Sequence, residues 1–113
     1  MRDFLYVEDA AQGLLRLGLA ACALPPHGPQ DDAAWGLLAN LSTGAGASVG
    51  QLIDLCAELF HTSRLPQERE PAAGARASSL VLDNSRLAAL TGWRPQTDLR
   101  LGLGLSHRNA HNA

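Results

Sequence analysis

The chain has 113 residues, of which 46% are hydrophobic and 18% charged, and its formal net charge is −2. This length corresponds to one domain, or part of one, with a thin core. The slightly acidic balance argues against a nucleic-acid binder and against a protein that docks on anionic membranes, since both need clustered positive charge. The sequence contains no lysine, which excludes any mechanism that needs a side-chain ammonium group.

The cysteines and the hydropathy pattern indicate a compartment. No run of about 18 apolar residues is present, so we expect no transmembrane segment. Cys22 and Cys56 lie in apolar stretches of helical character. Two buried thiols of a reducing compartment explain them better than a disulfide framework, which is denser in short secreted chains. We therefore predict a cytoplasmic protein.

The first 60 residues alternate between short apolar runs and helical patterns. Residues 4–7 predict a strand, or an extended entry to a helix. A helix follows from about Ala10 to Leu24, with acidic Glu8 and Asp9 at its positive end. Because apolar residues nearly encircle this helix, we expect other structure to cover most of it. Residues 35–41 predict a buried strand. A helix then begins at Ser48, which has capping-box spacing with Gln51.

The remaining residues add a long loop, a strand and two helices. Residues 63–79 lack periodicity and predict the loop, and residues 80–82 predict a strand. Asp83, Asn84 or Ser85 caps a helix that Gly92 ends, and Thr97 caps a last helix through about Leu105. Residues 106–113 form a frayed polar tail. The whole pattern predicts an α/β fold with three short strands and about four helices.

Three motifs occur in an order that resembles a known family. The first is Arg2-Asp3-Phe4-Leu5-Tyr6-Val7-Glu8-Asp9, and the second runs from Asn40-Leu41-Ser42-Thr43-Gly44 to Ser48-Val49 and Leu52. The third combines Leu82-Asp83-Asn84-Ser85-Arg86-Leu87, Thr91-Gly92-Trp93-Arg94-Pro95 and Leu99 to Gly102. Together they resemble the C-terminal part of the NAD-dependent epimerase/dehydratase family, within the extended short-chain dehydrogenase/reductase superfamily.

The resemblance implies that this chain corresponds to only one part of a complete enzyme. It identifies residues 1–105 with the substrate-binding part of a Rossmann-like enzyme that acts on nucleotide sugars. Complete members bind NAD(P) through a glycine-rich loop and react through a Tyr-x-x-x-Lys pair. Here the only tyrosine is Tyr6, which the motif places elsewhere. We therefore expect a chain that contacts the nucleotide sugar, binds no cofactor and no metal, contains no catalytic residue, and works with a separate cofactor-binding half. Its apolar first helix also predicts self-association.

The resemblance also suggests phosphate ligands. The arginine that opens the family's first motif contacts the diphosphate of the nucleotide sugar, and Arg2 holds that position here. A guanidinium fork matches phosphate oxygens. The family's second arginine falls at Ala73 in this chain, and Arg69 and Arg76 flank that position. Arg2, Arg76 and Arg69 are therefore the candidate diphosphate ligands.

Other polar patterns have simpler explanations. Gly44, Gly46 and Gly50 do not have the spacing of a dinucleotide-binding loop, so they indicate a turn. His107 and His111 have no third metal ligand nearby and indicate solvated side chains. An alternative to the family assignment is a self-standing, non-catalytic α/β module that binds a nucleotide or a partner protein.

Overall fold

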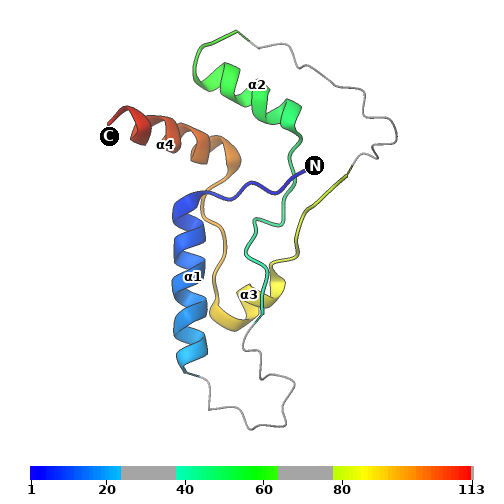
Figure 1. The fold of residues 1–113 in the computed structure, drawn as a ribbon, viewed down its shortest axis with the longest axis vertical. Coiled ribbons are helices and arrows are strands. Elements are labelled where there is room, and N and C mark those ends of the chain that lie inside the picture. The colour runs from blue at the N-terminus through cyan, green and yellow to red at the C-terminus, as the bar shows by residue number, and fades with distance from the viewer. Residues whose placement is uncertain (24–37, 64–77, 113) are drawn as a thin grey trace.

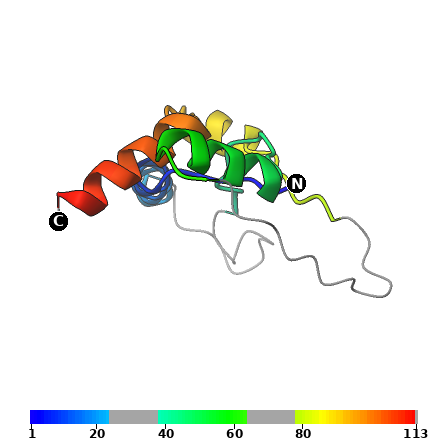
Figure 2. The same cartoon turned by 90° about the horizontal axis from the view of Figure 1, so that it is seen from above.

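The computed structural model describes residues 1–23, 38–63 and 78–112. Its helices are α1 (Val7–Cys22), α2 (Val49–Leu59), α3 (Ser85–Thr91) and α4 (Leu99–His111). They pack in two pairs, α1 with α3 and α2 with α4. The N-terminal segment and extended connections run between the two pairs (Figure 1). Seen from above, α2 and α4 lie side by side (Figure 2).

The expected α/β fold with three strands is wrong, for both the family assignment and the self-standing alternative. The described residues contain helices and no strand or sheet. Two isolated bridges are present: Arg2 pairs antiparallel with Ala47 and parallel with Leu80, and of these three residues only Leu80 lies in a segment that was expected to be a strand. Beyond Arg2, the Asp3 carboxylate accepts backbone N–H groups of the loop at Thr43 and Gly44. Residues 35–37 of the middle expected strand lie outside the described residues.

The residues that were predicted to start the first two helices do lie at their N-terminal ends. α1 begins at Val7, earlier than expected, with Glu8 and Asp9 in its first turn. α2 has the predicted capping box: the Gln51 backbone N–H donates to Ser48 Oγ over 3.1 Å, and the Ser48 N–H donates to Gln51 Oε1 over 2.8 Å. These signals are local, so they act whatever the rest of the chain does.

The C-terminal helices differ in detail from the prediction. Gly92 ends α3 with φ 71°, the left-handed conformation that glycine adopts most easily. Asp98, not Thr97, caps α4 and accepts the Leu101 N–H over 2.8 Å. α4 also continues through most of the expected polar tail. The His107 ring lies 4.3 Å from the Phe60 ring of the segment after α2, a contact that gives this last part of α4 a packing partner.

The core is small, as the length predicts. Tyr6, Leu87 and Trp93 are the buried hydrophobic residues of the described chain, and Asp9 is buried beside them. The described elements do not cover the first helix: most of the large apolar side chains of α1 are exposed in the single chain. The expectation of buried thiols is wrong, because Cys22 is exposed and Cys56 only half-buried. None of the described helices has the length and hydropathy needed to cross a membrane.

The carboxylate that precedes α3 leads to a pH-dependent prediction. The N-cap residue of α3 is Asn84, whose side chain makes no capping bond; instead the Ser85 N–H donates to Asp83 Oδ1 over 2.8 Å. This bond, and then one with the Ser85 side chain, lower the pKa of the exposed Asp83 carboxyl below its ordinary value. A pKa that is lower in the folded chain means that this contact stabilises the fold above the unfolded pKa, and that the contribution is lost as pH falls through the folded pKa. NMR titration of the carboxyl carbon should give a midpoint below the ordinary value of an aspartate. Ser85→Ala should bring it only partly back, since the backbone donor stays; a parent midpoint at or above the ordinary value would contradict the contact.

Candidate functional site

Arg2 lies where three distant segments of the chain meet. Its backbone N–H and C=O each form a 2.8 Å hydrogen bond with Ala47. On the other side, the Leu80 N–H donates to the Met1 carbonyl over 2.9 Å. The Arg2 guanidinium, which is exposed, donates to Ser78 Oγ over 3.0 Å. The backbone of the candidate phosphate ligand is thus held between two other segments, and its side chain remains accessible.

The other two candidate ligands are not placed. Arg69 and Arg76 lie outside the described residues. Ser78, which binds the Arg2 side chain, follows Arg76 by two positions in the sequence.

Asp3 fixes the loop next to Arg2. Its two carboxylate oxygens accept the backbone N–H groups of Thr43 and Gly44, each over 2.9 Å, and one of them also accepts the Thr43 hydroxyl. Gly44 has φ 74°, which glycine tolerates without strain. The Asp3 carboxylate thus holds the turn at Thr43 and Gly44, which precedes Ala47 in the chain, against the N-terminal segment.

The same loop is tied to the segment that precedes α3. Ser42 is buried, and its hydroxyl donates to the Leu82 carbonyl over 3.0 Å. The Asn84 side chain donates back to the Ser42 carbonyl over 2.8 Å. Side-chain hydrogen bonds therefore connect these two segments, where a sheet would use a ladder of backbone hydrogen bonds.

Asp9 joins α1 to the segment before α4. It is 6% exposed, and its Oδ2 accepts the backbone N–H groups of Gln96 and Thr97 over 3.0 and 2.8 Å. Its backbone carbonyl accepts the indole N–H of Trp93 over 3.0 Å. Acidic residues in a first helical turn are explained by the helix dipole alone, so no sequence pattern predicted this buried contact.

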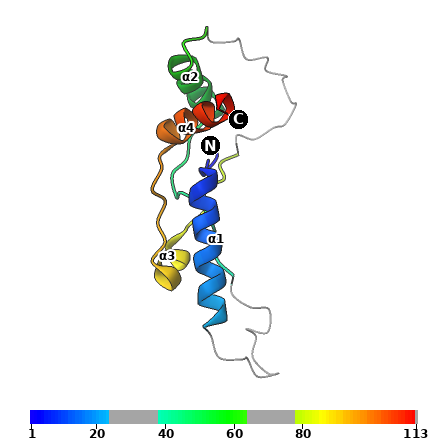
Figure 3. The ribbon, with the colours of Figure 1, turned by 90° about the vertical axis from the view of Figure 1, so that its left-hand side faces the viewer.

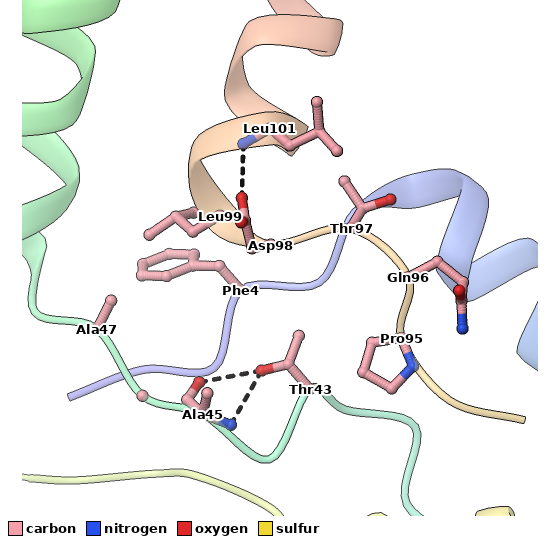
Figure 4. A pocket seen from close by; sticks show the side chains of 11 residues that line it. Phe4, Thr43, Ala45, Ala47, Pro95, Gln96, Thr97, Asp98, Leu99 and Leu101 are labelled. Carbon is pink, nitrogen blue, oxygen red and sulfur yellow. Dashed lines mark hydrogen bonds between the residues drawn. The ribbon is translucent and has the colours of Figure 1, made fainter.

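A cavity of about 390 Å³ opens beside Phe4 (Figure 4). The loop of residues 43–47 and the segment of residues 95–101 form its walls, and Arg2 is not among the lining residues. Two polar groups that line this cavity, the Thr43 hydroxyl and the Asp98 carboxylate, already form hydrogen bonds with neighbouring backbone groups. A second cavity of about 320 Å³ shares Phe4, Asp98 and Leu99 with the first and extends toward α2 and α4. The first cavity is of a size that holds a small molecule.

The glycine loop does not fit NAD(P). A dinucleotide pyrophosphate needs free N–H groups at the loop and at the start of the following helix. Here the Asp3 carboxylate already accepts the loop N–H groups of Thr43 and Gly44, and it would repel a phosphate. The Ser48 and Gln51 capping box occupies the start of α2. This loop therefore does not offer a nicotinamide dinucleotide the N–H groups that would bind it.

The two histidines of α4 lie close to each other. His107 and His111 have ring centroids 4.4 Å apart. No group of three or more His, Cys, Asp or Glu side chains in the described ranges has an arrangement that would hold a metal ion.

Comparison with protein-family models, with curated proteins and with solved structures finds no match for this chain.

Proposed function

We propose that this chain is a nucleotide-sugar-binding segment, in which Arg2 binds the diphosphate and the chain itself performs no oxidation or reduction. The observation that carries the proposal is the position of Arg2: an exposed guanidinium on a backbone that hydrogen bonds hold at Ala47. A guanidinium has five N–H donors, and the Ser78 hydroxyl accepts from one of its nitrogens. The fork geometry suits a bidentate contact with phosphate oxygens.

The contacts among the three motifs support this proposal. Asp3 of the first motif binds the loop of the second through Thr43 and Gly44. Asp9 of the first motif binds the segment that follows Trp93 in the third. Residues that resemble one family's signature in sequence therefore also contact one another in space. We extend the proposal to the family's chemistry: a separate cofactor-binding half supplies NAD(P), and the complete protein is an epimerase, dehydratase or reductase of nucleotide sugars in the cytoplasm.

Calorimetric titration with UDP tests the assignment of Arg2. Arg2→Ala should weaken UDP binding about tenfold or more, because it removes a charged hydrogen-bond donor from the diphosphate. Arg2→Lys should restore only part of the loss, because an ammonium keeps the charge but not the fork. Arg108→Ala, which removes an exposed arginine of α4 far along the chain, is the matched control and should bind like the parent.

Two further measurements separate the diphosphate contact from other contributions. Uridine, which lacks the diphosphate, should bind the parent and Arg2→Ala equally well. Arg69→Ala and Arg76→Ala should each lose less affinity for UDP than Arg2→Ala. If Arg2→Ala binds UDP like the parent while either loop substitution abolishes binding, the loop holds the phosphate and the assignment is wrong.

A further inference from the structure

α1 presents an apolar face that no described element covers. Val7, Leu14, Leu15 and Leu19 are between 62% and 72% exposed. The opposite face of the helix carries its buried residues, Asp9 and Gly13, and packs against α3. Figure 3 shows α1 extending away from α2 and α4, with α3 along one side of it.

Six exposed residues form one stripe on this face. At about 3.6 residues per turn, they fall within a sector of roughly 100°. We call them the outer stripe: Val7, Ala11, Leu14, Leu15, Gly18 and Cys22. The polar residues Glu8, Gln12 and Arg16 lie beside the stripe or behind it, so the stripe itself is entirely apolar. Leu19, although 72% exposed, also lies outside the stripe, about 40° around the helix from Leu15 and beyond Glu8.

The outer stripe is symmetric about its midpoint. Leu14 and Leu15 flank that midpoint. Counting outward, Ala11 mirrors Gly18, and Val7 mirrors Cys22. Two copies related by a twofold axis would bring their four central leucines together, with small residues facing small residues on either side. Small residues at such positions let two helix backbones approach closely. A twofold interface requires this kind of self-complementarity, and an unrelated partner does not.

The direction of pairing also follows from α1. Antiparallel helices place the positive end of one macrodipole beside the negative end of the other, whereas parallel helices place like ends together. Parallel pairing would also bring Glu8, at the edge of the stripe, level with Glu8 of the second copy. Antiparallel pairing separates these two carboxylates by about 20 Å along the helix axis.

We propose that the chain forms a homodimer by antiparallel pairing of α1 through the outer stripe, with Leu14 and Leu15 at the twofold axis. α1 has 16 residues and is therefore about 24 Å long. Such a stripe covers less than the roughly 800 Å² per partner of a standard interface. The dimer is accordingly weak, with a dissociation constant on the order of 10 µM or above. Arg2 lies outside α1, so this proposal does not depend on the proposed function.

Sedimentation equilibrium over a range of concentrations tests the interface. The parent should shift from monomer to dimer as concentration rises. Leu14→Glu should weaken dimerisation roughly tenfold or more, since it places a charge beside the twofold axis in both copies. Leu38→Glu is the matched control, because Leu38 is 78% exposed but lies outside α1, and it should dimerise like the parent. A parent that stays monomeric, or a Leu14→Glu variant that dimerises like the parent, would overturn the proposal.

Disulfide mapping tests the register without disturbing the core. In a Cys56→Ala background, Val7→Cys places a thiol opposite Cys22 of the second copy. Disulfides need Cα atoms about 4–7 Å apart, so this variant should form reciprocal crosslinks in a glutathione redox buffer. The background chain alone should not crosslink, because its two Cys22 residues would lie about 22 Å apart along the paired helices.

Arg16→Cys in the same background is the control, because residue 16 lies on the far side of α1 from the outer stripe; it should crosslink no more than the background. A disulfide between the two copies of Cys22 would indicate parallel pairing and would overturn the proposal. UDP titration of Leu14→Glu separates the two proposals, since the variant should lose dimerisation and retain UDP affinity. Loss of both would show that the stripe substitution acts through the fold of the chain and not through an interface.

Discussion

Replacing Asp9 with alanine should lower the free energy of unfolding by about 2–4 kcal/mol. The carboxylate is buried, and its Oδ2 is the acceptor for the N–H groups of Gln96 and Thr97. Alanine removes this acceptor and leaves both donors without their partner, which costs more than the net contribution of the bonds themselves. In a chain with so small a core, a loss of this size is a large fraction of the total stability.

A graded series makes this result specific. Asp9→Asn keeps an oxygen that can accept both N–H groups, so it should lose only the charge assistance, about 1 kcal/mol. Glu8→Ala removes the neighbouring acidic residue of the same helical turn, which is exposed, and should lose less than about 1 kcal/mol. Urea unfolding followed by circular dichroism, at concentrations low enough to keep the chain monomeric, gives all three values. Equal losses for Asp9→Ala and Glu8→Ala would contradict the role of Asp9.

Gly13→Val should destabilise the fold by about 1–3 kcal/mol. A Cβ at Gly13 would overlap the Leu41 Cδ1 methyl and come within 3.2 Å of the Trp93 ring. The Leu41 Cδ1 methyl is the far end of a flexible side chain, but the Trp93 indole is held by its hydrogen bond to the Asp9 carbonyl. The added side chain therefore forces α1 away from the segment that carries Trp93.

Gly104→Val is the matched control for that substitution. Gly104 lies in α4, and nothing lies within 4 Å of the position that its Cβ would take. Because valine forms helix more readily than glycine, this variant should be as stable as the parent or more stable, by up to about 0.5 kcal/mol. Thermal unfolding monitored at 222 nm compares the two. If Gly13→Val is as stable as Gly104→Val, then α1 does not pack on Trp93 as described.

The helices could be predicted from the sequence because their signals are local. The Ser48 and Gln51 capping box lies within four residues, and Gly92 closes α3 through its own backbone conformation. Strands differ, because an apolar run becomes a strand only if partners pair with it along its length. Residues 80–82 have that composition, but a single bridge forms, at Leu80. Nothing within a short window of sequence reveals how many ladder bonds a distant segment will supply.

The site could be predicted only in part for a similar reason. The motif singled out Arg2, but its contact with Ser78 joins residues 76 positions apart. Asp3 and Asp9 were part of the same motif, yet their partners lie 40 to 88 positions away. The sequence predicts Phe4 in a strand or in an extended entry to a helix, and neither alternative indicates that it lines both cavities. Such long-range partners follow from the tertiary arrangement, which the spacing of residues within one motif does not contain.

The proposed contact between Arg2 and the diphosphate of a nucleotide can be observed in an NMR titration of the ¹⁵N-labelled chain with UDP, because the side-chain Nε–H signals of the arginines report separately. We expect the Arg2 Nε–H and the Ser78 amide to shift with one common saturation curve, and uridine to leave both in place. Shifts confined to other arginines, such as Arg16 and Arg94 around the polar cavity beside Asp9, or no shift at saturating UDP, would contradict it.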